Sequence, residues 1–389
     1  MNSAGNLLKP SLICYKGEFD VQVENLLYHV RLTAQEVKRL ELLFDDLALA
    51  LQRWAPGLQI LPFGSIVTGL GIKSSDVDCH IVLPNCTQPY PGLVIHARNI
   101  LRKYFGKFSN LFAIVNAKVP IVKFLHIPTK FNCDVNFNSP AGVYNSRLIS
   151  QLLLMDSSQR ALKLAIIIKY WSKVHKITGT NLLASYALTL MVILYLQLKD
   201  ILPSIKQLQD DEPQHMQDHW NTAICTDVGR YTRNSDKSLY DLLTGFFECY
   251  ANLNFEDNII SPYLGSILNR SSFKKLQNVP LAFEIYKQNI LSNACKPLGI
   301  NTYMCVQDPF EHSRNTAGSV HVQLGKKITS HFQFGARMAS ELPPEEFLSA
   351  ILMKDPTGNV PRVEKRPVAK KVLQNKIKKA NIGVQQARQ

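Results

Sequence analysis

The stretch FGSIVTGLGIKSSDVDCHIVL (residues 63–83) places two aspartates one residue apart at the head of an apolar run. The alternation in residues 76–83 predicts a strand with Asp76, Asp78 and His80 on one face. Neighbouring carboxylates repel each other, and they lose hydration when a sheet buries them. Solvent or a bound cation must relieve this repulsion, so the two aspartates are the first candidates for a functional site.

The composition suits a globular protein with a basic end. The chain has 389 residues, 46% of them hydrophobic, which is enough to bury more than one core. No apolar stretch reaches the length of a membrane span, and no secretory signal or Arg-rich transit peptide is recognisable. Eight scattered cysteines lack the spacing of a disulfide framework or zinc site. We therefore expect a cytoplasmic protein with reduced thiols, and a nuclear location is left open.

The charge is unevenly distributed along the chain. The net charge is +14, and residues 361–389 hold nine Lys or Arg against one Glu, a net charge of +8. A basic balance suits a polyanionic partner such as RNA. A solvated segment that only keeps the protein soluble is the alternative for these residues.

The order of the predicted elements is that of an α+β protein. Thr33 and Glu36 form a capping box at the start of a predicted helix, and Pro56 follows its end. The segment from 209 to 221 is rich in Asp, His and Gln and is expected to be an exposed loop. Trp171 is expected in the core. Helices are predicted at 33–54, 91–106, 146–155, 158–176, 181–199, 238–253 and 279–291, and strands at 58–63, 76–83, 116–127 and 130–138.

Two lobes with a cleft between them follow from this order. A small mixed sheet with helices is expected at residues 33–145, and a mainly helical part at 146–350. Residues 1–32 are expected to pack on the helical part, and residues 351–389 to form a basic mobile tail.

A third aspartate joins the first two. Asp134 falls on the polar face of a later strand, so neighbouring strands would bring three carboxylates together. Such clusters hold two divalent cations about 3.5–4 Å apart. Oxygen ligands favour Mg²⁺, with Mn²⁺ as the alternative. The turn at Gly64 and Ser65 would offer backbone N–H groups and a hydroxyl to phosphates. An Asp-x-Asp pair alone is a weak signal of a functional site, and Asp134 alone could be a solvated acid on a strand. The combination of the Gly-Ser turn, the Asp-x-Asp pair and a third aspartate in a later strand is far more specific.

The segments FGSIVTGLGIKSSDVDCHIVL, AKVPIVKF and CDVNFN resemble the core of the template-independent RNA terminal nucleotidyltransferases. This family holds terminal uridylyltransferases and cytoplasmic-type poly(A) polymerases, within the DNA polymerase β-like superfamily. The resemblance covers about residues 35–340. It implies that Asp76, Asp78 and Asp134 are the catalytic metal ligands and that Asp134 activates the RNA 3′-hydroxyl. It also implies a nucleotidyltransferase domain at 33–145 and a helical domain at 146–350 with a PAP-associated segment, YDLLTGFFECYANLNFE.

The resemblance also implies a set of nucleotide-binding residues. LKLAIIIKYWSKVHKI resembles a helix that directs two lysines at the triphosphate, and NLLASYALTLM one whose Ser-Tyr pair contacts phosphate and base. VQDPFEHSRNTAG resembles the family's nucleotide-recognition loop. Without the resemblance, the lysine pair would be read as a solvated face and the tyrosine as core. The implied residues are Phe63, Gly64, Ser65, Asn145, Lys169, Lys173, Ser185, Tyr186, Asp308, Glu311 and Arg314.

Base choice depends on the recognition loop. Uridylyltransferase members commonly carry a histidine immediately before the loop asparagine, whereas Arg314 precedes Asn315 here and His312 lies two residues earlier. Arginine can donate to uracil O4 but cannot accept from the adenine 6-amino group. It is also long enough to swing out and leave a roomier site. We therefore expect mixed use of ATP and UTP.

The resemblance implies template-independent addition of AMP or UMP to RNA 3′ ends, with a nucleoside triphosphate and RNA as the partners. We expect a monomer, and an RNA-binding adaptor protein is left open because no RNA-recognition motif appears. Two alternatives remain at this point. One is a 2′-5′ oligoadenylate or cyclic-dinucleotide synthase-like enzyme, which shares the Asp-x-Asp core, and the other is an inactive RNA-binding scaffold.

Overall fold

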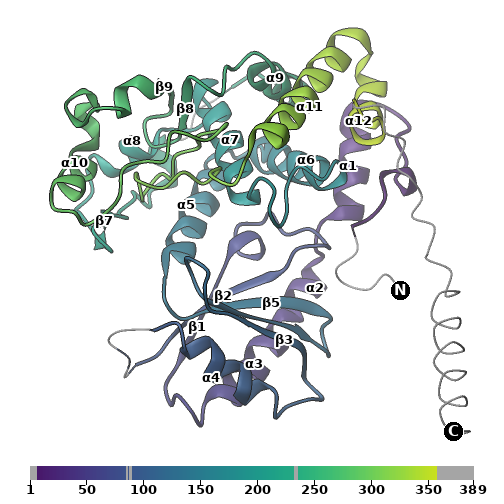
Figure 1. Ribbon diagram of the computed structural model, residues 1–389. Coiled ribbons are helices and arrows are strands. Elements are labelled where there is room, and N and C mark those ends of the chain that lie inside the picture. Colours follow the sequence, from purple (N-terminus) through teal and green to yellow (C-terminus); the bar gives the residue numbers. More distant parts are fainter. Residues whose placement is uncertain (1–6, 85, 87–89, 232–234, 357–389) are drawn as a thin grey trace, which may run out of the picture. The chain divides into compact units, whose positions relative to one another are not determined.

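A mixed five-stranded sheet carries the aspartates (Figure 1). The computed structural model describes residues 7–84, 86, 90–231 and 235–356, so the predicted basic tail lies almost wholly outside the described residues. The strand order is β1-β2-β5-β4-β3, with β2 and β5 parallel and the other neighbours antiparallel. The strands are β1 (Gln59–Phe63), β2 (Val77–Val82), β3 (Phe108–Ile114), β4 (Ile121–His126) and β5 (Phe131–Asn136).

The predicted alternation along β2 is confirmed. Val77, Cys79 and Ile81 are fully buried, in a core shared with helices α3 (Leu40–Leu51) and α4 (Leu93–Leu101). These two helices lie along the lower side of the sheet in the view of Figure 1. The apolar side chains of β2 therefore fix the sheet on the helices, and Asp78 is left on the opposite face.

Long helices make up most of the remaining chain. A second core joins α1, α6, α7, α9, α11 and α12. Trp171 is 1% exposed within it and stacks on Phe332, as predicted for a core tryptophan. The helices are α1 (Phe19–Val30), α5 (Ala141–Met155), α6 (Arg160–Val174), α7 (Ser185–Leu198), α9 (Leu239–Ala251), α11 (Val322–Glu341) and α12 (Pro344–Met353).

The smaller elements complete the described chain. The predicted capping box is present, since Thr33 accepts from the Glu36 amide and Glu36 from the Thr33 amide. No helix in the described part of the chain is long and apolar enough to cross a membrane. The small elements are α2 (Ala34–Lys38), α8 (Ile205–Gln209), α10 (Glu284–Leu291), β6 (Met216–Gln217), β7 (Trp220–Asn221), β8 (Asn258–Ser261) and β9 (Ser266–Asn269).

Several elements differ from the sequence prediction. The helix expected at 33–54 is divided at Arg39 into α2 and α3. Strand β3 was not predicted, because it is an edge strand whose outward residues include the exposed Phe112 and Ile114. Helices α1, α11 and α12 were also missed. The loop expected at 209–221 contains the β6–β7 ribbon and buries Trp220.

The predicted boundary between residues 145 and 146 falls inside α5, which runs without a break from the sheet towards the second core. The boundary predicted at 351 falls inside α12. Helix α1, from the segment expected to pack on the helical part, shares the core of α6, α9 and α12. The described residues up to Lys354 form one compact unit.

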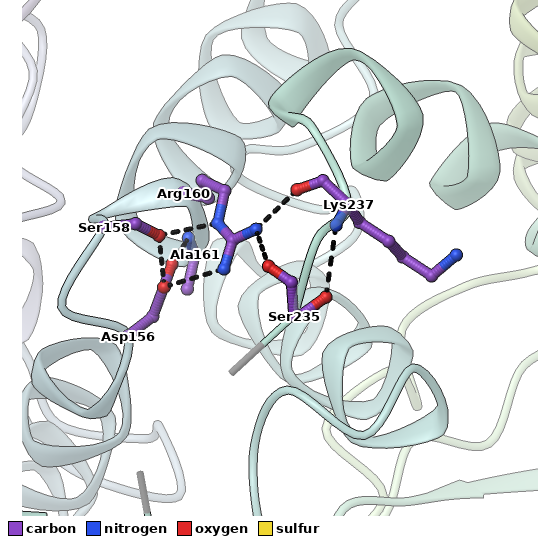
Figure 2. Close-up of polar contacts among 6 residues, drawn as sticks. All are labelled: Asp156, Ser158, Arg160, Ala161, Ser235 and Lys237. Atoms are coloured by element: carbon purple, nitrogen blue, oxygen red, sulfur yellow. Dashed lines mark hydrogen bonds and ion pairs between the residues drawn. The ribbon is translucent and has the colours of Figure 1, made fainter. Parts of the chain in front are cut away.

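A buried polar junction fixes the start of α6 (Figure 2). Asp156 is 5% exposed, and its carboxylate accepts from the Ala161 amide (2.7 Å) and from Ser158. Arg160 donates to the same carboxylate and to the carbonyl oxygens of Ser235 and Lys237. Because α9 begins at residue 239, this junction joins the first turn of α6 to the segment that leads into α9.

We expect Asp156→Ala to lower the free energy of unfolding by about 2–4 kcal/mol, because it removes the acceptor of the Ala161 amide in the first turn of α6 and leaves the Arg160 guanidinium without its carboxylate. Chemical denaturation followed by circular dichroism measures this loss. The matched control is Asp45→Ala on the exposed side of α3, for which we expect a change within about 0.5 kcal/mol. Equal losses for the two variants would contradict the structural role of the junction.

Candidate active site

A pocket of about 540 Å³ lies over the polar face of the sheet. Strands β2 and β5, the turn after β1, helices α5, α6 and α7 and the loop before α11 all contribute to its lining. Every predicted site residue except Asp308 lines it: Phe63, Gly64, Ser65, Asp76, Asp78, Asp134, Asn145, Lys169, Lys173, Ser185, Tyr186, Glu311 and Arg314.

The strand register brings the aspartates together. Asp78 in β2 is the direct neighbour of Asp134 in β5, and Asp76 lies immediately before β2. Burial, together with the charges of Asp134 and Asp76, raises the pKa of Asp78 to about 7. Burial also raises the pKa of Asp134. The folded chain therefore holds these carboxylates in a place where their negative charge is unfavourable.

Lys123 compensates part of this charge. It lies opposite Asp134 in the neighbouring strand β4, and its Nζ donates to Asp134 Oδ2 (2.8 Å). The other oxygen, Asp134 Oδ1, is buried and has no hydrogen-bond partner among the described residues. Lys123 was not among the predicted site residues, although its alternation with Val122 and Phe124 indicates that it points to the polar face.

The turn Gly64–Ile66 brings backbone close to the carboxylates. Gly64 has φ +78°, and a Cβ there would lie 2.5 Å from Asp78 Oδ2, so only glycine fits. We expected its amide to be available to phosphate. This expectation is wrong: the Gly64 N–H donates to Ser146 Oγ (2.7 Å), because α5 packs on the turn.

The three carboxylates have the chemistry of a cation site. Within the described residues, no three His, Cys, Asp or Glu side chains already surround one metal position. The chemistry nevertheless fits a divalent cation, since three carboxylates line one pocket and Asp134 Oδ1 is a buried oxygen without a donor. Hard oxygen ligands of this kind suit Mg²⁺ or Mn²⁺.

Two lysines of α6 and the N-terminus of α7 bring positive charge to the pocket. Lys169 is 8% exposed, and its Nζ donates to the Leu70 carbonyl (2.8 Å) and to Ser75 Oγ (3.1 Å). Burial and the nearby Lys173 lower the pKa of Lys169 to about 7. Ser185 begins α7, so the N-terminus of this 14-residue helix lies at the pocket. Two lysines and a helix N-terminus together favour an anion.

Hydrogen bonds among its own residues hold the predicted recognition loop in place. Asp308 is 1% exposed, and its Oδ1 accepts from the amides of Phe310 and Glu311 (3.0 Å each). Arg314 Nη1 lies 3.8 Å from Asp308 Oδ2. Asn315 is likewise held within the loop, where its side chain bonds to backbone atoms including the Val306 amide. Asp308 was expected among the nucleotide-binding residues; it is buried, is not among the lining residues of the pocket and holds the loop, whereas Arg314 lines the pocket.

Tyr186 lies beside this loop. Burial, reinforced by the charge of Asp308, raises the pKa of Tyr186 well above its usual value. The phenol therefore stays protonated.

One ion pair across the pocket was not foreseen. Lys118, in the connection between β3 and β4, donates to Glu311 Oε1 (2.8 Å), and both residues line the pocket. The two residues are 193 positions apart, so no local pattern in the sequence indicates the pairing. Ser139 also lines the pocket, with Thr68, Ser75 and Thr189.

Two family models match this chain. The model described as "Poly(A) RNA polymerase, mitochondrial-like, central palm domain" matches residues 19–153, and the model described as "Cid1 family poly A polymerase" matches residues 238–314. Each model covers less than half of the chain, and both describe poly(A) polymerases, so the chain is similar to this family of RNA nucleotidyltransferases. The resemblance stated from the sequence is thus confirmed, and the matched regions contain the aspartates and most of the recognition loop.

Curated relatives point to the same family. Poly(A) RNA polymerase GLD2 of Danio rerio is 26% identical over 328 residues, covering 82% of this chain and 61% of the relative. Poly(A) RNA polymerase cid11 of Schizosaccharomyces pombe is 28% identical over 290 residues, covering 73% and 54%. The chain thus spans somewhat more than half the length of these relatives.

Among solved structures, mtPAP in complex with UTP superposes with a TM-score of 0.75 at 20% identity, covering 90% of this chain and 76% of that one. The Cid1 poly(U) polymerase gives a TM-score of 0.67 at 20% identity, covering 84% and 95%. The expected α+β fold class is therefore confirmed.

The repulsion at the site predicts a stabilising substitution. The raised pKa means that ionising Asp78 costs folding free energy; this cost is absent near pH 4, grows up to about pH 7 and is complete above it. We expect Asp78→Asn to raise the melting temperature in EDTA by at least about 2 °C at pH 8, and by much less near pH 4.5.

Differential scanning fluorimetry at both pH values measures this difference, with Asp45→Asn as the control. A melting temperature of Asp78→Asn equal to or below that of the unsubstituted protein at pH 8 would contradict the electrostatic account.

Proposed function

We propose that this chain adds AMP or UMP from a nucleoside triphosphate to RNA 3′ ends without a template. The observation that carries the proposal is the single pocket in which Asp76, Asp78 and Asp134 face Lys169 and Lys173. Carboxylates on one side and ammonium groups on the other suit a triphosphate with its cations. The similarity to the poly(A) polymerase family models makes RNA the expected acceptor.

Asp76, Asp78 and Asp134 would hold one or two divalent cations, Mg²⁺ or Mn²⁺. When bound, such cations lower the pKa of an attacking hydroxyl and stabilise charge on the phosphates. Asp134 Oδ1, a buried oxygen without a donor, would be one of the ligand atoms. Lys123 would keep Asp134 ionised through its hydrogen bond to Oδ2.

The chain's other residues would bind and orient the substrates. Lys173 and the N-terminus of α7 at Ser185 hold the triphosphate, and Lys169 adds its charge while anchored to the loop at Leu70 and Ser75. Asn145 and Tyr186 hold the ribose and base. The 3′-hydroxyl of RNA lies next to Asp134, which accepts its proton as the oxygen attacks the α-phosphorus and pyrophosphate leaves.

Mixed base choice is proposed from the recognition loop. Arg314 is paired with the buried Asp308, so its guanidinium stays at the edge of the pocket with its remaining donors available. Those donors suit uracil O4, while an arginine side chain does not close the site against a purine. A cytoplasmic location, a monomeric state and an RNA-binding adaptor complete the proposal.

Primer extension tests the activity. We expect the protein to extend a 5′-labelled RNA with ATP or UTP in the presence of Mg²⁺ or Mn²⁺, through 3′-5′ linkages. Asp76→Ala/Asp78→Ala should lower the rate at least about 100-fold, because it removes two carboxylates that hold the cations. Asp45→Ala is the control. No extension with any nucleotide would contradict the function, and equal extension by the double variant would contradict the site.

Base choice has its own test. We expect Arg314→His to shift the ratio of UTP to ATP incorporation about fivefold towards UTP, the effect of one hydrogen bond worth about 1 kcal/mol. The shorter imidazole, paired with Asp308, would remain within reach of uracil O4 and reduce the room for adenine. Single-nucleotide incorporation rates measure the ratio, with Arg102→His as the control. An unchanged ratio would show that residue 314 does not read the base.

A further inference from the structure

A second pocket, of about 290 Å³, shares the recognition loop but none of the lining residues of the first. His312, which lies between Glu311 and Arg314, contributes to its wall. Trp220 and Tyr263 supply aromatic surface, and the acidic side chains come from Asp210, Glu212 and Glu284. These six residues are called the loop pocket below. The proposed reaction uses none of them.

His312 has one buried hydrogen-bond acceptor without a partner in the described part of the chain. The side chain is 6% exposed, and its Nε2 lies 3.2 Å from the Pro309 carbonyl oxygen. A carbonyl oxygen only accepts, so Nε2 carries the proton and Nδ1 is a bare acceptor. No described residue hydrogen-bonds to Nδ1, which is buried. Burial lowers the pKa of His312 to about 3, so the ring is neutral at physiological pH. A buried acceptor without a donor is costly, so a donor brought to it would be favourable.

The aromatic rings around His312 favour a cation. The ring centroid of Tyr263 lies 4.1 Å from that of His312, and the centroid of Trp220 lies 5.5 Å away. Both rings line the pocket, and electron-rich ring faces attract guanidinium and ammonium groups.

The acidic residues point to the same kind of ligand. Asp210, Glu212 and Glu284 are acceptors when ionised, and the lining residues include no Lys or Arg. Asp210 is already paired with Lys206, and Glu284 accepts from Gln288 (3.3 Å). Carboxylates retain lone pairs beyond one donor, so each can accept a further hydrogen bond.

We propose that the loop pocket binds the arginine side chain of a protein partner. A guanidinium group is planar and has five donors, so it can stack on an aromatic ring while donating to His312 Nδ1 and to the carboxylates. An ammonium group has three donors and no plane to stack. The pocket volume is near the lower limit of about 300 Å³ for ligand pockets, which suits one long side chain.

Titration with a minimal probe tests the proposal. The probe is N-acetyl-L-arginine methylamide, a capped arginine residue, and Trp220 fluorescence reports binding because this indole lies in the pocket. We expect a saturable change that Trp220→Phe removes. The control ligand is the citrulline analogue, which has nearly the same shape without the charge, and we expect it to bind at least about tenfold more weakly.

Variants assign the binding to the pocket. We expect Glu212→Gln and Glu284→Gln each to weaken binding of the arginine probe about fivefold, and His312→Leu to weaken it by a similar factor, because each removes an acceptor. Glu41→Gln on α3 is the matched control and should bind as the unsubstituted protein does. Since the two glutamates are not in the core, their variants keep the test valid even if His312→Leu unfolds.

Three results would overturn the proposal. The first is equal affinity for the arginine and citrulline probes, which would exclude recognition of the charge. The second is unchanged affinity in both glutamate variants, which would place the binding elsewhere. The third is equal or tighter binding of spermidine or of N-acetyl-L-lysine methylamide, which would show that the pocket takes ammonium groups rather than a protein arginine.

Discussion

Repulsion among Asp76, Asp78 and Asp134 is the constraint on which the site depends. A shift of one residue in the register of β2 would move Asp78 to the other face of the sheet and relieve the repulsion. The same shift would expose Val77, Cys79 and Ile81 and bury their polar neighbours. The apolar core under the sheet therefore enforces the close approach of the carboxylates. Folding free energy from α3, α4 and the sheet sustains an arrangement that electrostatics alone would oppose.

The surrounding residues moderate this repulsion without removing it. Lys123 pairs with one oxygen of Asp134, and Lys169 lies buried nearby with a lowered pKa. Gly64 allows the backbone to approach Asp78 to a distance that any side chain would prevent. A fully neutralised cluster would have no need of cations, whereas this one keeps a buried oxygen on Asp134 without a donor. The incomplete compensation is what makes the pocket suited to a metal-bound triphosphate.

Much of this arrangement follows from short-range pattern in the sequence. Alternation alone placed Asp78 and Asp134 on polar faces, and helical spacing placed Lys169 and Lys173 on one side of α6. Alternation could not show that β2 and β5 are neighbours. The family resemblance implied that the three aspartates act together, and the strand register pairs Asp78 with Asp134.

Other features could not be read from local pattern. The pairing of Lys118 with Glu311 joins residues far apart in the chain, and β3 has too little buried surface to produce a clear alternation. The burial of Asp308 and the use of the Gly64 amide by Ser146 depend on how the loop and α5 pack. His312 appeared in the sequence only as a neighbour of Arg314; its neutral ring and open acceptor become visible once Trp220 and Tyr263 are in place.

The most direct measurement is anomalous X-ray diffraction from crystals grown with Mn²⁺ and a non-hydrolysable ATP or UTP analogue. The account predicts at least one manganese peak within bonding distance of Asp76 and Asp78, with Asp134 Oδ1 among the ligands and the triphosphate directed towards Lys173. Clear nucleotide density in the pocket with no manganese peak at the three carboxylates would contradict it.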